Sequence, residues 1–413
     1  MTSFPFSGAS AAADTRELDK DALSLALMDA RNHTLSLLGA HEECAGRSGV
    51  PSDAADTPYP PPVWMAGQLA WLAEWWINRN PQRTLGVRSP GDGIRLASLL
   101  PQADTWFHPR GDRWHQPLPD AAEVRSYMLD QLEGTLELLD KAVDSAQGLD
   151  LYRAVLLHED ARSEHFLVQA QSLGLDWRAA VQRPPARAAR APVVVPATRW
   201  TPGSPPGFSA SPEDPQAQAL DVPPFEIDAQ AVSWAQYLEF VDDGGYDRPE
   251  LWHPTGWQWV QASGRRAPAH VEQITLSAGA AAQNFFGKLA RLAGQQPVMH
   301  VSWWEADAWT RWAGRRLPAA VEWEAAAHAA ARQGFHWGDV HEWTAATLRP
   351  SPGLQPQDWT EGTFLDPRPA WGAARVRCGA SFLTPPRLRQ RRSRSFALPD
   401  SDQDFVGFRS CAI

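Results

Sequence analysis

A stretch rich in proline, alanine and serine, residues 178–218, divides this chain into two parts with different sequence patterns. Proline lacks a backbone N–H and interrupts helices and central strands, so such a stretch is typical of a linker. At roughly 150 residues per domain, 413 residues suggest two or three domains. We place the boundary near residues 185–195. The expected units are residues 1–185, a linker and start of the second domain at 186–222, and a second domain at 223–413.

The first part predicts a bundle of four helices. Apolar residues recur there at helical spacing, and Gly39, a proline run at 60–62 and Pro81 are plausible boundaries. Four helices joined by connections, one of them long, suggest a four-helix bundle. The candidate helices cover residues 18–39, 63–78, 121–147 and 150–173.

The second part predicts an α+β domain with little regular secondary structure. Its apolar runs are short, and long connections rich in Trp, Gly and Pro separate them. The whole chain contains 21 Trp, which suit either an irregular core built from large rings or an aromatic pocket for a cationic ligand. Composition leaves both interpretations open. Candidate strands are residues 224–229 and 375–382, and candidate helices are 233–244, 303–314 and 320–330.

Charge, hydropathy and cysteine content exclude several functional classes. The formal net charge of −10 gives no overall attraction to nucleic acid or to anionic lipid. No apolar run reaches the roughly 18 residues of a membrane span, and the N-terminus lacks the pattern of a secretory signal. The three cysteines, Cys44, Cys378 and Cys411, form no disulfide framework. We therefore expect a cytoplasmic protein with neither a nucleic-acid partner nor a membrane partner.

The fourth candidate helix contains an unusual set of polar residues in LLHEDARSEHF, residues 156–166. His158, Arg162 and His165 share one helical face. Two His at i and i+4 form a metal pair in helical sites, but Arg stands at i+4 here, and His158 and His165 are about 10 Å apart along the axis. The residues alone favour a buried network of ion pairs and leave a metal site open.

The motifs of both parts resemble those of the ergothioneine-biosynthesis sulfoxide synthases and their relative selenoneine synthase. In the first part the matches are LLHEDARSEHF and VWMAGQLAWLAEWWINRNPQR at 63–83. In the second part they are HVSWWEADAWTRWAGRRLPAAVEWEAAA at 300–327 and DFVGFRSCAI at 404–413. WWINRNPQR and FRSCA look closer to the selenoneine branch. The resemblance implies a DinB-like four-helix bundle followed by a C-type-lectin-like formylglycine-generating-enzyme (sulfatase-modifying-factor) domain.

The resemblance also implies a non-haem Fe2+ bound by three His. The matching positions hold Gln68, His158 and Arg162, so one of the three ligands is retained. Gln can offer a carbonyl oxygen to a metal, whereas the guanidinium of Arg is a permanent cation that cannot ligate.

Other implied site residues also differ from the family pattern. Where relatives use Asn-Trp-Asp to bind hercynine, the trimethylammonium betaine of histidine, this chain has Ser395, Phe396 and Ala397. Phe396 can offer a ring face to the trimethylammonium group. The position of a family tyrosine that assists oxygen chemistry falls near Trp359, which has no phenolic proton. Arginines that can meet an anionic or sugar co-substrate, or can be structural, are Arg79, Arg83 and Arg113.

Two hypotheses follow from these residues. The first is an enzyme that uses Fe2+ and O2 to join selenium or sulfur, from a selenosugar or a thiol donor, to the imidazole C2 of hercynine. The second is a non-catalytic relative that has lost the iron site and binds the betaine or regulates another process. Motif matches from end to end of the chain favour the first hypothesis, and we expect the enzyme as the function of the family. Five substitutions favour the second hypothesis, and they are Gln68, Arg162, Ser395, Ala397 and Trp359.

Overall fold

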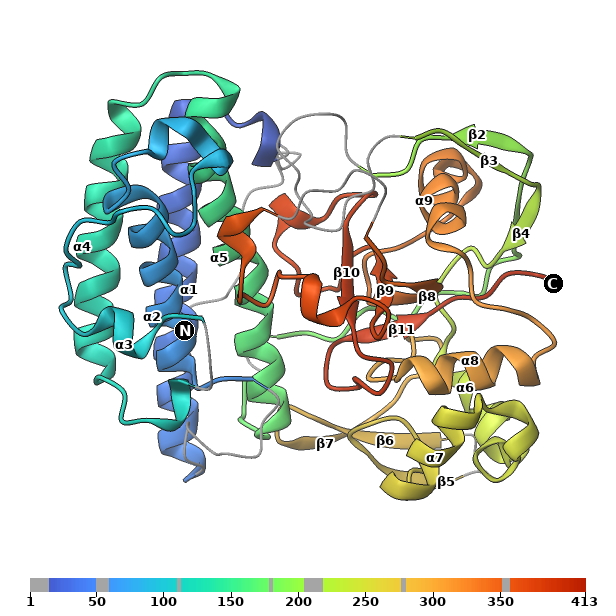
Figure 1. The fold of residues 1–413 in the computed structure, drawn as a ribbon. Helices are drawn as coiled ribbons and strands as arrows, with labels where there is room; N and C mark the ends of the chain where they lie inside the picture. The colour runs from blue at the N-terminus through green and yellow to red at the C-terminus, as the bar shows by residue number, and fades with distance from the viewer. Residues whose placement is uncertain are drawn as a thin grey trace.

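The fold, seen in a computed structural model, comprises a helical region beside an α+β region (Figure 1). The structure describes residues 15–49, 59–109, 113–177, 181–203, 218–275, 280–350 and 357–413. This arrangement confirms the predicted α+β class. The helices of the first region are α1 (Lys20–Ser48), α2 (Pro62–Ala73), α3 (Ala103–Trp106), α4 (Ala121–Asp140) and α5 (Ala146–Ser172). Short helical turns there are η1 (Thr15–Glu17), η2 (Glu74–Asn78), η3 (Arg83–Arg88) and η4 (Arg113–His115).

The long helices α1, α2, α4 and α5 pack against one another as a bundle. Helix α1 starts where the Asp19 side chain accepts a hydrogen bond from the Ala22 N–H, a standard N-cap. The prediction that α1 ends at Gly39 is wrong, since the helix continues to Ser48. Glycine inside a helix costs only about 1 kcal/mol, and the buried Cys44 further along α1 adds apolar contact that offsets this cost.

Helix α2 continues into a π-helical turn, η2, in which the Arg79 N–H donates to the Glu74 carbonyl at 2.8 Å. Gly67 allows α2 to approach a neighbouring ring, because a Cβ there would lie 2.2 Å from Phe107. The next residue, Gln68, is fully buried.

The connection between the last two bundle helices differs from the prediction. Helix α4 ends at Asp140, before the predicted limit of 147, and α5 begins at Ala146. The cause is a cap, because the Ser145 hydroxyl accepts a hydrogen bond from the Gly148 N–H at 3.1 Å. The helix that carries the polar motif is therefore 27 residues long.

The second region contains a four-stranded sheet in the order β10-β9-β8-β11, in which only the β8–β11 pair is parallel. Its strands are β8 (His341–Thr347), β9 (Arg375–Cys378), β10 (Arg394–Ala397) and β11 (Val406–Phe408). The other strands form β1–β4 and β2–β3 pairs and a β5-β6-β7 sheet. They are β1 (Val193–Val195), β2 (Thr198–Trp200), β3 (Leu220–Val222), β4 (Phe225–Ile227), β5 (Val271–Thr275), β6 (Ala280–Phe285) and β7 (Lys288–Arg291).

The predicted strands at 224–229 and 375–382 occur as β4 and β9, and the three predicted helices also occur. Helix α7 and the β5-β6-β7 sheet were not predicted. The helices of this region are α6 (Trp234–Asp242), α7 (Pro254–Ser263), α8 (Trp303–Trp312) and α9 (Ala320–Ala329). Its short turns are η5 (Gly245–Asp247), η6 (Pro249–Leu251), η8 (Ala331–Gln333), η9 (Asp358–Thr360), η10 (Arg368–Ala370) and η11 (Pro386–Leu388).

Tryptophans supply much of the core of the second region. The indole N–H of Trp343 donates to the Val301 carbonyl at 2.7 Å, and that of Trp323 donates to the Glu342 carboxylate at 2.8 Å. These buried rings therefore have partners for their polar atoms, as buried Trp requires. Trp323 and Trp343 therefore belong to an irregular core, which is one of the two interpretations of the high Trp content.

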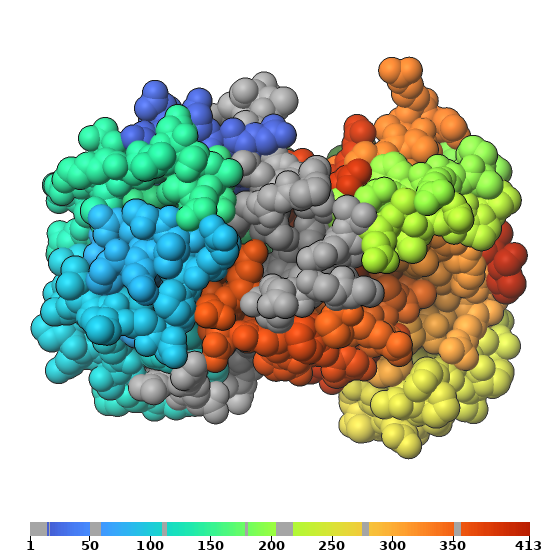
Figure 2. All heavy atoms as spheres, turned by 45° about the horizontal axis from the view of Figure 1, so that its top comes forward, coloured from blue at the N-terminus to red at the C-terminus, as the bar shows by residue number. Residues whose placement is uncertain are grey.

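The two regions meet along α5. In the space-filling view, the orange part of the second region lies directly against the helical region (Figure 2). A backbone contact agrees with this view, because the Gly91 N–H donates to the Asp358 carboxylate at 3.0 Å. No helix within the described residues is long and apolar enough to cross a membrane.

Candidate functional site

Helix α5 positions the candidate site because its polar residues contact both regions of the molecule. Toward the bundle, the Glu159 carboxylate accepts a hydrogen bond from Arg31 Nε of α1 at 2.9 Å. Toward the second region, Asp160 accepts two hydrogen bonds of 2.8 Å from Arg387. Glu164 also faces the second region, where it pairs with His341. For Glu159 and Asp160, the predicted network of buried ion pairs is confirmed.

The three positions assigned to metal ligands lie together inside the bundle. Arg162 Nη2 is 3.4 Å from Gln68 Oε1, and Arg162 Nη1 is 3.3 Å from His165 Nδ1. The guanidinium stacks on the ring of Phe364 at 3.9 Å, and the rings of His158 and His165 also contact Phe364. We call these five residues the Arg162 cluster.

The electrostatics of the Arg162 cluster are set by one buried cation. Arg162 is 4% exposed and makes no ion pair with a carboxylate of the described residues. Burial lowers the pKa of Arg162 to about 9, so the guanidinium stays charged at neutral pH. Burial, followed by the charge of Arg162, lowers the pKa of His165 to about 3 and that of His158 well below its ordinary value. Both imidazoles are therefore neutral at pH 7.

This donor set does not fit an Fe2+ ion. Of the three assigned positions, only His158 supplies a neutral nitrogen, and Arg162 places a positive charge among them. Within the described residues, no three His, Cys, Asp or Glu side chains are grouped as metal ligands require. His158 Nε2, Gln68 Nε2 and Arg162 Nε are buried and have no hydrogen-bond partner. A buried polar atom without a hydrogen bond costs free energy, and a cluster whose role is only structural avoids this cost.

A cavity of about 320 Å³, here called the interdomain cleft, lies beside the cluster between α5 and the second region. Its bundle wall includes Asp160, Glu164 and His165. Half-buried Phe364 also lines it. Gln68, His158 and Arg162 are absent from its lining, so Phe364 and His165 separate the guanidinium from the cleft.

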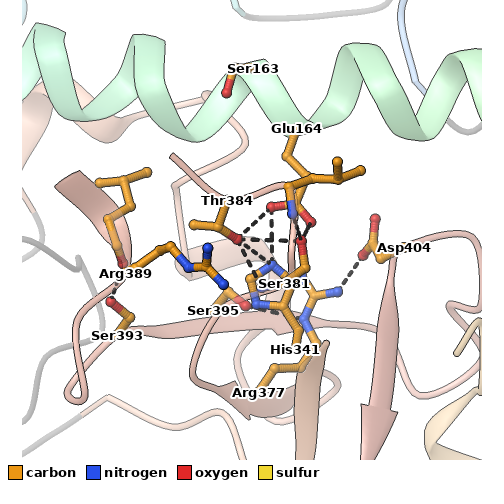
Figure 3. A network of polar contacts seen from close by, with 12 residues as sticks. Ser163, Glu164, His341, Arg377, Ser381, Thr384, Arg389, Ser393, Ser395 and Asp404 are labelled. Carbon is orange, nitrogen blue, oxygen red and sulfur yellow. Dashed lines mark hydrogen bonds and ion pairs between the residues drawn. The ribbon is translucent and has the colours of Figure 1, made fainter. Parts of the chain in front are cut away.

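Two predicted substrate-binding residues line the interdomain cleft. Ser395 and half-buried Phe396 lie on β10, which pairs with β9 so that Ser395 is opposite Arg377. Arg377 Nε donates to Ser395 Oγ at 3.2 Å, and Arg377 also pairs with Asp404 (Figure 3). The Tyr59 hydroxyl donates to the same Asp404 carboxylate. Burial opposes ionisation of Asp404, but the charge of Arg377 and the hydrogen bonds from Tyr59 and Arg377 together outweigh it and lower the Asp404 pKa.

Glu164 of α5 forms a second group of polar contacts, with residues of the second region (Figure 3). Its carboxylate accepts hydrogen bonds from Ser381 Oγ at 2.7 Å and Thr384 Oγ1 at 2.9 Å, and it lies 3.2 Å from His341 Nε2. Burial opposes ionisation, yet the charge of His341 and these hydrogen bonds lower the Glu164 pKa to about 2. The cleft therefore holds an ionised carboxylate at neutral pH.

Three other predicted site residues, Arg79, Arg83 and Trp359, do not line the interdomain cleft. Arg79 pairs with Asp104 through contacts of 2.6 and 2.9 Å, and Arg83 donates to the Asn80 carbonyl at 3.3 Å. Trp359 is 2% exposed and borders a different cavity of about 360 Å³, which it shares with tryptophans of α2 and η2. The backbone of Arg113 begins η4, but its side chain lies outside the described residues. Ala397 lines the cleft.

Several cleft residues were missed by sequence reasoning. Asp160 and Glu164 are spaced i and i+4, so the pattern of α5 could have identified a second polar face beside that of His158. No comparable signal marks Phe364 or His341. Each reaches the cleft from a separate part of the second region, and only the tertiary fold brings them to α5.

Comparison with known proteins agrees with this two-region organisation. Residues 178–339 match the family described as the sulfatase-modifying factor enzyme 1-like domain. A protein of Mycolicibacterium smegmatis named hercynine oxygenase is 30% identical over 410 residues, covering 84% of this chain and 90% of that protein.

Two further relatives carry the same name. The protein of Mycolicibacterium thermoresistibile is 27% identical, covering 94% of each chain. That of Mycobacterium tuberculosis is 28% identical, covering 84% of this chain and 90% of its own length. The resemblance recognised in the sequence motifs is thus confirmed at the level of the family, and with these identities over nearly the full length the chain belongs to the hercynine oxygenase family.

Proposed function

We propose that this protein binds hercynine, or a closely similar trimethylammonium derivative of histidine, in the interdomain cleft without using iron at the family position. The observation that carries the proposal is the composition of the cleft wall. Phe396 and Ser395, at the positions implied for betaine binding, line a cavity of about 320 Å³, a size suited to a small molecule.

The charges of the cleft suit a ligand that carries both signs. The Glu164 carboxylate supplies negative charge near aromatic rings, which favours a trimethylammonium group. Arg392 also lines the cleft and supplies positive charge for the carboxylate of the ligand. Hercynine combines these two groups with an imidazole ring.

The test is calorimetric titration of hercynine into the purified protein. Replacing Phe396 by Ala should weaken binding by about 0.5–2 kcal/mol, the usual range for a cation–π contact. Phe396→Leu preserves apolar volume but loses the ring face, so it should resemble Phe396→Ala, whereas Phe396→Tyr should bind like the wild type. Histidine, which lacks the methyl groups, should bind more weakly than hercynine. Unchanged affinity in Phe396→Ala would remove this residue from the site.

A second candidate is the synthase implied by the resemblance, which uses Fe2+ and O2 to join a thiol or a selenosugar selenol to the imidazole C2 of hercynine. The unpaired Nε2 of His158 favours it, because a buried imidazole nitrogen without a partner is available to a metal. The substitution of Arg at position 162 weighs against it. Oxygen uptake, with product masses measured after incubation with hercynine, Fe2+ and either donor, distinguishes this candidate from binding alone.

A further inference from the structure

We propose that the guanidinium of Arg162 replaces the metal ion of the family, so that a side chain supplies the cation inside the bundle and Fe2+ does not bind there. This inference goes beyond betaine binding. It concerns the Arg162 guanidinium, which Phe364 and His165 separate from the cleft, and a different measurement tests it.

The position of the guanidinium is the first argument. Its two terminal nitrogens point at the side chains of Gln68 on α2 and His165 on α5, at 3.4 and 3.3 Å. One of the assigned ligand positions is thus in direct contact with Arg162, while His158 lies one helical turn away on the same face. The guanidinium therefore lies among the groups that would have to surround a metal ion.

The partners of the guanidinium are the second argument. They are a carbonyl oxygen, an imidazole nitrogen and the face of an aromatic ring, 3.9 Å away in the case of Phe364. All three attract a cation without neutralising it, and the described residues place no carboxylate in an ion pair with Arg162. A divalent cation entering this space would meet a fixed positive charge at close range in a buried environment, where repulsion is strong.

The test restores the missing imidazoles. Gln68→His and Arg162→His together would place two further imidazoles beside His158, with positions 158 and 162 about 6 Å apart along the helix. After anaerobic incubation with Fe2+ and desalting, we expect the double variant to retain close to one iron per chain and the wild type less than about a tenth of that amount. Titration with Co2+, followed by its visible absorption, reports imidazole coordination independently of any activity.

A matched control separates loss of charge from gain of ligands. Gln68→Asn with Arg162→Gln removes the cation but adds no imidazole, so it should retain about as little iron as the wild type. Circular dichroism checks that each variant is folded. A folded double His variant that takes up no more iron than this control would overturn the proposal.

The wild-type protein provides a second test, in which no new metal ligand is introduced. If the wild type retains about one Fe2+ per chain, and His158→Ala abolishes that uptake, a metal binds at this site despite Arg162 and the proposal is wrong. Absence of uptake, or uptake that His158→Ala leaves unchanged, supports it. Calorimetry with hercynine is a separate measurement, so either result leaves the test of betaine binding intact.

Discussion

At the scale of single residues, the ionisable groups near Phe364 differ in charge state, although burial disfavours the charged form of each. In contact with the ring, His158 and His165 stay neutral because burial and Arg162 both disfavour their protonation. In the cleft, Glu164 stays ionised because His341 and two hydroxyl groups compensate for its burial. The charge of each group is therefore determined by its immediate partners.

Glu164 should make the stability of the protein sensitive to acid. Its pKa is about 2 in the folded state against an ordinary value of 4.5, so its contribution is complete above about pH 4.5 and is lost as the pH falls toward 2. At 1.36 kcal/mol per pKa unit, this contribution amounts to about 3 kcal/mol. Glu164→Gln should flatten the pH dependence of the unfolding free energy between pH 5 and 2, measured by urea denaturation. Substitution of exposed Glu239 on α6 by Gln is the control and should leave that dependence unchanged.

At the scale of elements, α5 is stabilised by polar contacts on two of its faces. The bundle face pairs Glu159 with Arg31 through contacts of 2.9 and 3.1 Å, and the face toward the second region pairs Asp160 with Arg387. The side chains of Arg31 and Glu159 are 2% and 6% exposed, so neither charge is substantially hydrated. Removing one partner leaves the other charge buried and unpaired.

The Arg31–Glu159 pair should show strong coupling in a double-mutant cycle. We expect Arg31→Met alone to destabilise the protein by about 3–5 kcal/mol, because the Glu159 carboxylate loses its main partner. Arg31→Met combined with Glu159→Leu should cost much less than the sum of the single changes, since no isolated charge remains. Chemical denaturation of the four proteins measures the coupling. Additive effects would show that the two side chains contribute independently.

The sequence predicts the elements better than it predicts the site. The apolar periodicity indicated where the long helices of the first region lie, because the spacing of apolar residues reflects which face of a helix is buried. Extension of α1 past Gly39 depends on contacts with the other helices, which local glycine content does not reveal. The position of Phe364 over Arg162 depends on packing between two regions, so spacing along the chain could not indicate it.

At the scale of the whole molecule, Arg387 connects the second region to two bundle helices. It donates to Asp160 of α5 and to Asp29 of α1, the latter at 2.7 Å, from the turn η11. Asp160 is almost fully buried, whereas the side chain of Asp29 is 63% exposed. The contact with Asp160 therefore contributes most of the electrostatic stabilisation of this junction.

Loss of Arg387 should weaken the junction between the regions. We expect Arg387→Ala to destabilise the protein by about 3–5 kcal/mol, because Asp160 would be left as a buried and unpaired carboxylate. Arg387→Lys retains the charge but loses the two-point contact, and its effect should be intermediate. Differential scanning calorimetry measures both variants, and adding Asp160→Asn to Arg387→Ala should recover part of the loss. A wild-type unfolding temperature in Arg387→Ala would contradict this role.

The stacking of Phe364 on Arg162 has a consequence for how the molecule responds to its surroundings. An organic cation belongs to the polypeptide from the moment of synthesis, whereas an iron ion must be acquired from a cellular supply and can be lost again. A guanidinium has no accessible second oxidation state, and chelators do not extract it. The wall between the bundle and the cleft would then keep its shape when iron is scarce or when oxidants are abundant.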